Sequence, residues 1–287
     1  MSADSTNNVL NKLALNPHTT KPFAEGGIGV LYLLENFQGK KALLKIPAYH
    51  KRPPEEHWLL KHDLKKEAKI LSYANIQVLP KLFDYDPNGE FLIRSYIDGN
   101  TLSSFEIQSL NVCVRKQLLI ALINTAKILF NAIHENERGN FVIRDFKPVN
   151  LIFSFSNPDY FYLIDVGSLR PESDMISKTP KDHKIGSGKW LYWSPEQLLE
   201  DEKHLDRRSD YFSFGATAFY ILTGKAPYSN SISEKNKVLI TYQKEYEKVQ
   251  QQLNYLSNNE DLFPNDILKT ISECLNPNPN YRKLKFD

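Results

Sequence analysis

A short polar segment in the middle of the chain carries an acid, a cation and an amide at fixed offsets. Asp145, Lys147 and Asn150 fall within six residues, between two apolar runs. Pro148 keeps the segment out of a helix interior, so we predict a rigid loop between two short strands. A carboxylate, an ammonium group and a carboxamide held in one loop can accept a proton, neutralise a phosphate and bind a metal ion. Phosphoryl transfer needs these three tasks.

A second acidic position follows a run of aromatic and aliphatic residues at 160–164. Asp165 ends that run and Gly167 stands two residues later, which places a carboxylate at a turn, where it can serve as a metal ligand. The run 151–153 can pair with 160–164 as a hairpin, and the hairpin would bring Asp165 close to Asn150. Either motif alone is also consistent with a carboxylate in a surface turn. Both motifs in this order favour a common site.

Ile143-Arg144-Asp145 with Lys147 and Asn150 resembles the catalytic loop of the eukaryotic-like (Hanks-type) serine/threonine protein kinase family, and Asp165-Val166-Gly167 resembles its metal-binding triplet. The resemblance runs in order from Phe23 to Arg282. It implies an α+β fold of two lobes, with ATP between a small β-rich N-lobe and a larger α-helical C-lobe. The expected boundaries are a flexible N-terminal lead-in at 1–17, the N-lobe at 18–97 and the C-lobe at 98–287, which together form a single kinase domain.

A glycine cluster near residue 26 precedes a β-branched and aromatic run. Bare backbone can approach phosphate oxygens closely because no Cβ intervenes. The segment resembles the kinase glycine-rich loop, with Ala24 in place of the first glycine; a simple hairpin turn is the alternative. The resemblance implies nucleotide contacts in this loop, in the third strand and in the hinge between lobes, at Glu25, Gly26, Gly27, Gly29, Leu31, Lys45, Ser95 and Ile97.

An amphipathic helix is predicted at about 54–73. Its apolar stripe consists of Leu60, Leu64, Ala68 and Leu71. Glu67 lies on that stripe, where a carboxylate is costly unless it is paired. Lys45, near the end of a strand predicted at 41–47, is the natural partner; the alternative is that Glu67 lies at the stripe's edge in water. The resemblance implies that Glu67 holds Lys45 against the α- and β-phosphates of ATP.

The resemblance assigns a role to each polar residue of the two motifs. Asp145 is expected to orient the attacking hydroxyl and accept its proton, and Lys147 to stabilise charge on the transferring phosphoryl group. Asn150 and Asp165 are expected to hold Mg²⁺, which bridges phosphate oxygens.

Arg94 departs from the family's pattern, since it stands where an apolar or small polar residue usually closes the back of the nucleotide pocket. We expect Arg94 to compete with Lys45 for Glu67 and so restrain the active arrangement. Arg94→Met is therefore predicted to raise the rate of phosphorylation. The alternative is that the arginine head leaves the pocket while its stem packs.

Two further departures are aliphatic. Ile143 and Val166 stand where histidine and phenylalanine are usual, and with Leu71 they are expected to form an apolar stack that supports activity.

The polar segment 167–194 resembles an activation segment. Phosphorylation of Ser177 or Thr179 is a candidate switch with Arg144 as the receiving cation, and Ser187 is expected to bond to Asp145 and Lys147. A solvated loop rich in hydroxyls is the alternative.

Three charged positions have expected structural roles. Asp210 would cap a helix that ends at about 223 or anchor the catalytic-loop backbone. Arg282 would pair with Glu196, within the closing tripeptide 194–196.

Composition excludes several classes of protein. The chain has 287 residues, 41% apolar and 24% charged, with room for one large domain or two lobes. A net charge of +2 gives no electrostatic case for nucleic acid as a partner. Cys113 and Cys274 lack further ligands at metal spacing, so we expect reduced thiols. We find no signal-peptide h-region and no membrane-spanning run, and expect a cytoplasmic protein. The composition hints at a bacterial source; secretion into a host and the oligomeric state stay open.

We therefore expect an enzyme, an ATP- and Mg²⁺-dependent serine/threonine protein kinase that phosphorylates protein substrates and itself. Lys147 resembles the serine/threonine class. Two alternatives remain. The departures at 24, 94, 143 and 166 favour a pseudokinase scaffold slightly, whereas retention of Lys45, Asp145, Asn150 and Asp165 argues against it. A kinase of small molecules is disfavoured by the long segment 167–194.

Overall fold

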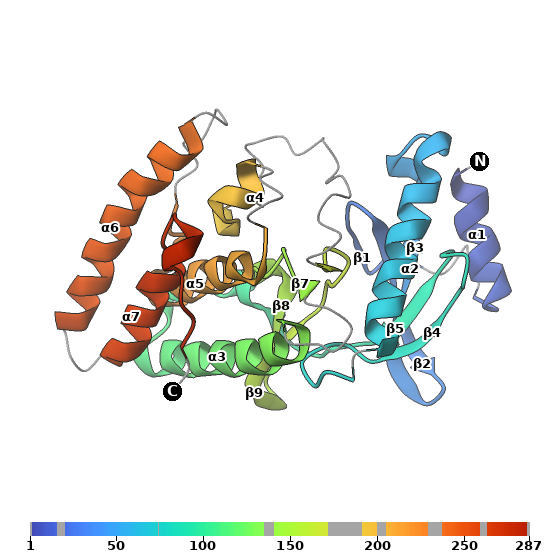
Figure 1. The fold of residues 1–287 in the computed structure, drawn as a ribbon. Coiled ribbons are helices and arrows are strands. Elements are labelled where there is room, and N and C mark those ends of the chain that lie inside the picture. Colours follow the sequence, from blue (N-terminus) through green and yellow to red (C-terminus); the bar gives the residue numbers. More distant parts are fainter. Residues whose placement is uncertain are drawn as a thin grey trace. The chain divides into compact units, whose positions relative to one another are not determined.

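A computed structural model describes the chain at residues 2–15, 21–73, 75–134, 141–171, 191–199, 205–228, 237–258 and 263–285. The chain divides into two compact units (Figure 1). The first unit comprises Met1–Asp98 with Asp165–Gly167, and the second comprises Gly99–Ile164 with Ser168–Asp287.

The first unit is built on a five-stranded antiparallel sheet in the order β1-β2-β3-β5-β4. Its strands are β1 (Ala24–Glu25), β2 (Gly29–Phe37), β3 (Lys40–Pro47), β4 (Leu82–Tyr85) and β5 (Leu92–Ser95). Gln38 and Gly39 take positive φ angles of 51° and 78° in the turn between β2 and β3. Glycine adopts this conformation without steric cost, which explains the tight hairpin there.

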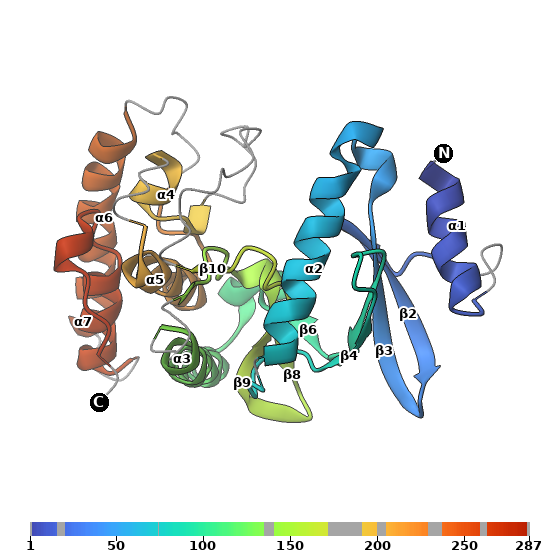
Figure 2. The same cartoon turned by 45° about the vertical axis from the view of Figure 1, so that its right-hand side comes forward.

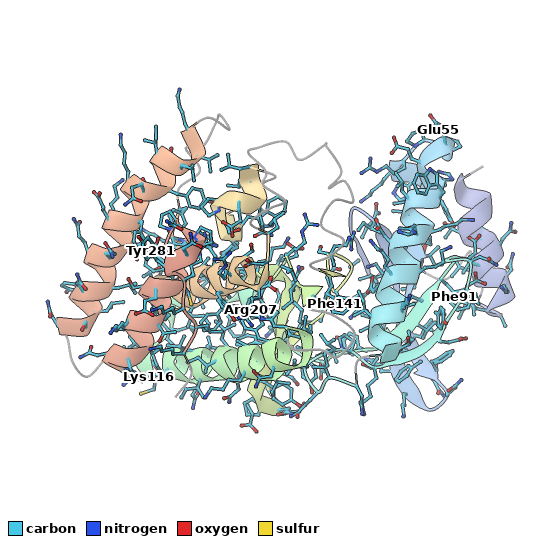
Figure 3. The ribbon with its side chains drawn as sticks, viewed as in Figure 1. Glu55, Phe91, Lys116, Phe141, Arg207 and Tyr281 are labelled. Carbon is cyan, nitrogen blue, oxygen red and sulfur yellow. The ribbon has the colours of Figure 1, made fainter. Side chains whose placement is uncertain are left out.

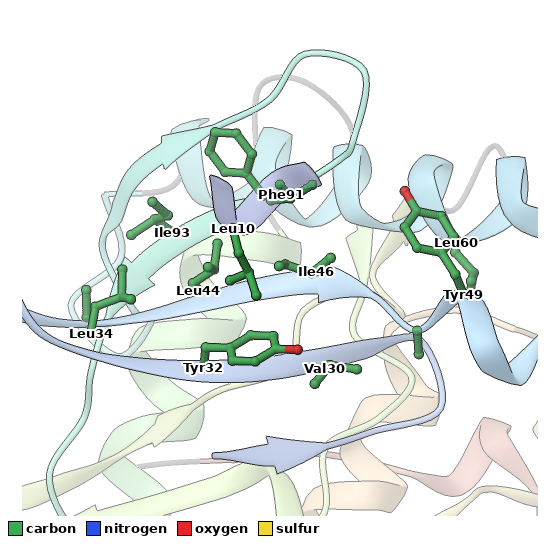
Figure 4. Close-up of a cluster of buried hydrophobic side chains, with 13 residues drawn as sticks. Leu10, Val30, Tyr32, Leu34, Leu44, Ile46, Tyr49, Leu60, Phe91 and Ile93 are labelled. Atoms are coloured by element: carbon green, nitrogen blue, oxygen red, sulfur yellow. The ribbon is translucent and has the colours of Figure 1, made fainter. Parts of the chain in front are cut away.

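Two helices cover the two faces of this sheet. Helix α2 (His57–Tyr73) lies on one face and α1 (Ser2–Lys12) on the other, as the two views show (Figures 1 and 2). The predicted stripe of α2 is buried, and Glu67 is buried with it. The alternate residues of β3, Leu44 and Ile46, form a core with Leu10 of α1, whose side chain points toward them (Figure 4).

Residues 2–12, within the stretch expected to be a flexible or lightly docked lead-in, form α1. Val9 and Leu10 are 4% and 2% exposed because they pack into the core beneath the sheet. Lys12 adds an ion pair with Asp86 at 3.1 Å. Burial of two adjacent apolar side chains stabilises a helix whose sequence is otherwise polar.

The second unit is mainly helical. Its helices are α3 (Val112–His134), α4 (Pro195–Leu199), α5 (Arg207–Thr223), α6 (Val238–Asn258) and α7 (Asn265–Cys274). A small sheet joins β6 (Asn100–Thr101), β8 (Leu151–Ser154) and β9 (Asn157–Leu163), and a second ladder pairs β7 (Phe141–Val142) with β10 (Arg170–Pro171). The predicted hairpin of 151–153 with 160–164 is present, with Leu151 opposite Leu163. The α+β class is therefore confirmed.

Helix α5 ends as its sequence predicts, with Gly224 after its last turn at a φ of 73°. Its N-cap is Asp206, whose side chain accepts from the Arg208 N–H, and not Asp210. Of the two cysteines, Cys113 is exposed at the start of α3 and Cys274 is buried at the end of α7. Burial raises the pKa of the Cys274 thiol. Among the described helices, none combines the length and apolar character required to cross a bilayer.

Candidate active site

The buried ion pair of the first unit joins β3 to α2. Lys45 Nζ donates to Glu67 Oε2 at 2.6 Å, as the sequence predicts. Burial opposes the charged form of Lys45, but the carboxylates of Glu67 and Asp165 outweigh burial and raise the pKa of the lysine. Lys45 therefore stays cationic at neutral pH, and α2 is held by a charged link to the sheet.

Gly29 is required by the path of the Lys45 side chain. A Cβ placed on Gly29 would lie 2.9 Å from Lys45 Cγ, 3.0 Å from Lys45 Cε and 3.1 Å from the Ile46 carbonyl oxygen. These distances are too short for a carbon atom at that position, so a side chain at 29 would displace the lysine. A Cβ on Gly27, in contrast, would meet open space.

The glycine turn is braced from the segment that follows β3. Lys51 Nζ donates to the Gly26 carbonyl at 2.8 Å and pairs with Glu25 at 2.7 Å. His50 lies 2.7 Å from Glu25 as well, and hydrogen bonds from Lys51 and His50 lower the pKa of the Glu25 carboxyl. The Gly26 N–H donates to the Gly29 carbonyl at 2.9 Å. The Glu25 side chain thus stabilises the turn rather than pointing freely outward.

The acidic triplet at 165–167 belongs to the first unit. Asp165 Oδ1 accepts from the Gly167 N–H at 3.1 Å. A Cβ on Gly167 would lie 3.3 Å from Asp165 Oδ1 and 4.0 Å from Glu67 Oε2, so both carboxylates flank this glycine. With Lys45 they form one charged set.

The end of β5 carries the other predicted nucleotide contacts. The Ser95 and Tyr96 N–H groups donate to the carbonyls of Lys81 and Lys41, at 2.8 and 3.2 Å. These bonds fix the strand end and commit both donors within the first unit. Arg94, one residue earlier, is 3% exposed.

The polar loop of the second unit is organised around Asp145. Lys147 Nζ donates to Asp145 Oδ1 at 2.5 Å. Asn150 Nδ2 donates to Asp145 Oδ2 and to the Asp145 carbonyl, both at 2.9 Å. Ile164, the residue before Asp165, donates its N–H to the Asn150 carbonyl at 2.9 Å. The predicted acid, cation and amide are therefore brought together in one loop, which follows Phe141 of β7 (Figure 3).

Two side chains from distant helices, Asp210 and Gln197, bond to the backbone of this loop, and His134 supports Asp210. Asp210 of α5 accepts from the Ile143 and Arg144 N–H groups at 2.8 and 2.9 Å. His134 Nε2 bonds to Asp210 Oδ2 at 2.9 Å, and Gln197 Nε2 donates to the Arg144 carbonyl at 2.9 Å. Arg144 has a φ of 68°, a conformation unfavourable for a residue with a Cβ. The loop is therefore held in a strained shape by its anchors.

Asp210 proves to be the anchor of the loop, while Asp206 caps α5. Sequence reasoning missed His134 and Gln197. His134 offered a signal, since it is a polar residue on the buried face of α3, stacked on Phe130 at 4.7 Å between ring centroids. For Gln197, the only signal in the sequence was its position directly after Glu196.

The predicted pair of Arg282 with Glu196 is present and fully buried. Arg282 Nη1 and Nη2 donate to the two Glu196 oxygens at 2.5 and 3.0 Å. Its remaining donors reach the carbonyls of Asn276, Pro277 and Arg208. The pair is structural, as expected.

Several expectations stay predictions. Leu71 and Val166 are buried in the first unit and Ile143 in the second, and their stack is untested. Ser177, Thr179 and Ser187 lie outside the described residues. The residues assigned to the nucleotide form two groups. The first unit holds Glu25, Gly26, Gly27, Gly29, Leu31, Lys45, Glu67, Ser95, Ile97 and Asp165, and the second holds Asp145, Lys147 and Asn150.

Comparison with known proteins gives one consistent result. Residues 18–283 match the protein kinase domain family. The chain is 26% identical over 226 residues to serine/threonine-protein kinase pkn2 of Myxococcus xanthus, covering 74% of this chain and 25% of that protein. It is 32% identical over 138 residues to serine/threonine-protein kinase PknB of Mycobacterium leprae, covering 48% and 20%. It is 24% identical over 237 residues to tyrosine-protein kinase MasK of Myxococcus xanthus, covering 76% and 35%.

The chain thus spans between 20% and 35% of the length of these three relatives. The family match covers most of the chain, and the β-rich first unit and helical second unit agree with a two-lobed kinase fold. This chain belongs to the protein kinase family.

Proposed function

We propose that this protein is an ATP-dependent kinase that transfers the γ-phosphoryl group to serine or threonine hydroxyls of proteins, including its own. The observation that supports this best is the loop in which Lys147 and Asn150 both donate to Asp145. Two donors fix the orientation of this carboxylate in a buried loop. Catalysis by positioning requires such a fixed orientation.

The loop would act on the substrate hydroxyl. Asp145 orients the hydroxyl and accepts its proton while the hydroxyl oxygen bonds to the γ-phosphorus and the bond to the ADP oxygen breaks. Lys147 neutralises the charge that develops on the phosphoryl oxygens.

The first unit would bind the nucleotide. Lys45, held by Glu67 at 2.6 Å, contacts the α- and β-phosphates. The backbone from Glu25 to Gly29, with its glycines at 26, 27 and 29, approaches the phosphates, and Leu31, which pairs with Lys45 across the sheet, packs on the base. The Ser95 carbonyl and the Ile97 N–H bind the adenine edge, because the N–H groups of Ser95 and Tyr96 are already committed.

The residues present fit a magnesium ion. Both nitrogen donations of Asn150 go to Asp145, which leaves the amide oxygen for a metal. Asp165 adds a carboxylate, and such hard oxygen ligands suit Mg²⁺. Within the described ranges, no group of three or more His, Cys, Asp or Glu side chains could hold a metal. Asn150 and Asp165 are the residues proposed to hold Mg²⁺, which when bound would neutralise phosphate charge.

The hydroxyl class of the substrate is a separate part of the proposal. Lys147 favours serine and threonine, and pkn2 and PknB are named serine/threonine kinases, whereas MasK is named a tyrosine kinase. Phosphoamino acid analysis of the product distinguishes the two classes.

The test is incubation of the full chain with labelled ATP, Mg²⁺ and a general protein substrate, followed by mass spectrometry of the modified residues. Asp145→Asn should lower the rate by about 10²–10⁴-fold, and Asp165→Ala should abolish metal-dependent labelling. Asp266→Asn, an exposed carboxylate in α7, is the control and should match wild type. Equal labelling by Asp145→Asn and wild type would contradict the proposal. Labelling of a metabolite but no protein would indicate a small-molecule kinase.

A further inference from the structure

Arg94 is a buried cation on the face of the sheet that carries Lys45. The antiparallel register pairs Arg94 with Leu43, and Lys45 with Leu92. Paired residues, and residues two apart on one strand, project from the same face of a sheet. Arg94 and Lys45 therefore share a face as diagonal neighbours, a separation that long side chains can span. Because Lys45 bonds to Glu67, α2 covers this same face.

The charge of Arg94 is poorly compensated by hydrogen bonds. Arginine side chains are cationic in proteins, and Arg94 is 3% exposed. Among the described residues, neither Nε of Arg94 nor Oε1 of Glu67 has a hydrogen-bond partner, and Glu67 is 2% exposed. A buried charge is costly unless opposite charge compensates it. The opposite charges on this face of the sheet are the carboxylates of Glu67 and Asp165, which act on Lys45.

Arg94 changes the net charge of the set around Lys45. Lys45, Glu67 and Asp165 carry a formal net charge of −1 without Arg94 and zero with it. The electrostatics of Lys45 show that Arg94 belongs to the set. Burial, then Glu67 and Asp165, act on the lysine most strongly, and Arg94 opposes its protonation, although the net effect is a raised pKa. The negative charges of Glu67 and Asp165 are thus already balanced by two cations, Lys45 and Arg94.

We propose that Arg94 is a specificity-determining residue that sets how strongly nucleotide binding depends on a divalent metal. A fixed guanidinium attracts nucleotide phosphates and repels metal cations, and both effects weaken the coupling between nucleotide and metal. Without Arg94, the group formed by Lys45, Glu67 and Asp165 carries a net negative charge. Nucleotide binding should then depend more strongly on the metal. The inference rests on the proposed function, because coupling is defined only if ATP binds.

The test is titration calorimetry of the full chain with the non-hydrolysable β,γ-imido analogue of ATP, in EDTA and in saturating Mg²⁺. The ratio of the two Kd values measures the coupling. Arg94→Met removes the charge and keeps an unbranched stem, and Arg94→Lys keeps the charge. Lys41→Met is the matched control. It removes a cation from the strand that carries Lys45, at a side chain that is 47% exposed.

We expect Arg94→Met to raise the ratio of Kd without metal to Kd with Mg²⁺ by about tenfold, while Arg94→Lys and Lys41→Met stay within about twofold of wild type. An unchanged ratio in Arg94→Met would overturn the inference. A ratio in Arg94→Lys equal to that in Arg94→Met would also overturn it, because the effect would then follow shape instead of charge. If circular dichroism shows Arg94→Met to be unfolded, Arg94→Gln replaces it under the same criteria. Wild type that binds nucleotide in neither buffer would contradict the proposed function itself, which is a distinct pattern.

Discussion

The two units each contain a buried carboxylate paired with a cation, but the pairs differ in how completely they are satisfied. Arg282 makes two hydrogen bonds to Glu196 and three to backbone carbonyls, and its guanidinium lies 4.9 Å over the Phe212 ring. Ser209 also donates to Glu196. Lys45, in contrast, makes one bond to Glu67, whose second oxygen has no partner among the described residues.

The difference separates the structural pair, Arg282 with Glu196, from the pair that is proposed to bind the nucleotide, Lys45 with Glu67. A pair whose every donor is matched contributes a fixed geometry, and any change to it leaves buried polar atoms unsatisfied. A pair with an unmatched oxygen keeps capacity for a further partner. Glu67 and Lys45 lie where the nucleotide and metal are proposed to bind, and their incomplete pairing is consistent with that role.

Breaking the satisfied pair should have the largest effect on stability. We expect Arg282→Met to lower the free energy of unfolding by about 3–5 kcal/mol, because Glu196 is left charged and buried. Urea denaturation followed by circular dichroism measures the loss. Lys248→Met, in a largely exposed pair with Glu245, is the control, and should cost less than about 1 kcal/mol. Equal losses in both variants would show that burial of the Arg282 pair has no energetic consequence.

Removing the loop anchor should have an intermediate effect on stability. Asp210→Ala leaves the N–H groups of Ile143 and Arg144 without their acceptor. We expect a cost of about 1–3 kcal/mol, mainly from the Ile143 N–H, because that bond is buried whereas the Arg144 bond is only partly buried. The strained φ of Arg144 should then relax, so phosphorylation should also fall. Denaturation and labelling measured on the same protein test this. A destabilised variant with full activity would contradict the positioning role of Asp210.

Changing the incompletely bonded pair of Lys45 with Glu67 should lower stability less than Arg282→Met does, but it should lower the phosphorylation rate. Glu67→Gln keeps the shape and an acceptor oxygen for Lys45, so we expect a loss of about 1 kcal/mol in unfolding free energy, and at least a tenfold fall in phosphorylation rate. Glu56→Gln, in the partly exposed pair with Arg52, should change neither quantity measurably. If Glu67→Gln cost as much stability as Arg282→Met, the contrast between the two pairs would fail.

The pair of Lys12 with Asp86 should have the smallest effect, and the effect should depend on pH. Burial opposes ionisation of Asp86, but Lys12 and the Asn88 and Glu90 N–H groups outweigh it and lower the pKa of the carboxyl. A lowered carboxyl pKa stabilises the fold above the unfolded-state value of about 3.9, and the contribution is lost as pH falls through the folded-state pKa.

We therefore expect Lys12→Met to cost less than about 1 kcal/mol at pH 7, because the lysine is largely exposed. The difference from wild type should shrink below pH 4, which denaturation at both pH values can measure. A difference that stays constant with pH would assign the effect to packing of the Lys12 stem.

The Lys45–Glu67 pair could be predicted because two signals agreed. An apolar stripe placed Glu67 on the buried face of a helix, and Lys45 stands where the resemblance places the lysine of the third strand. The pair of Arg282 with Glu196 was predicted from the resemblance alone.

Features that depend on tertiary contact could not be predicted from the chain. Among residues 6–12 of helix α1, the buried side chains are Val9 and Leu10, and the polar sequence around them indicated a flexible tail. His134 looked like one more residue of an apolar helix until Asp210, 76 positions later, supplied its partner. The need for glycine at 29 follows from the path of the Lys45 side chain, which no local pattern specifies.

The contrast between the two cysteines has a practical consequence. Cys113 is exposed and Cys274 is buried with a raised pKa, and the chain has no others. A maleimide dye at neutral pH should therefore attach at one defined place on the unmodified protein, at the start of α3 and away from the Asp145 loop in sequence. Nucleotide and metal binding can then be followed by fluorescence without removing any native side chain.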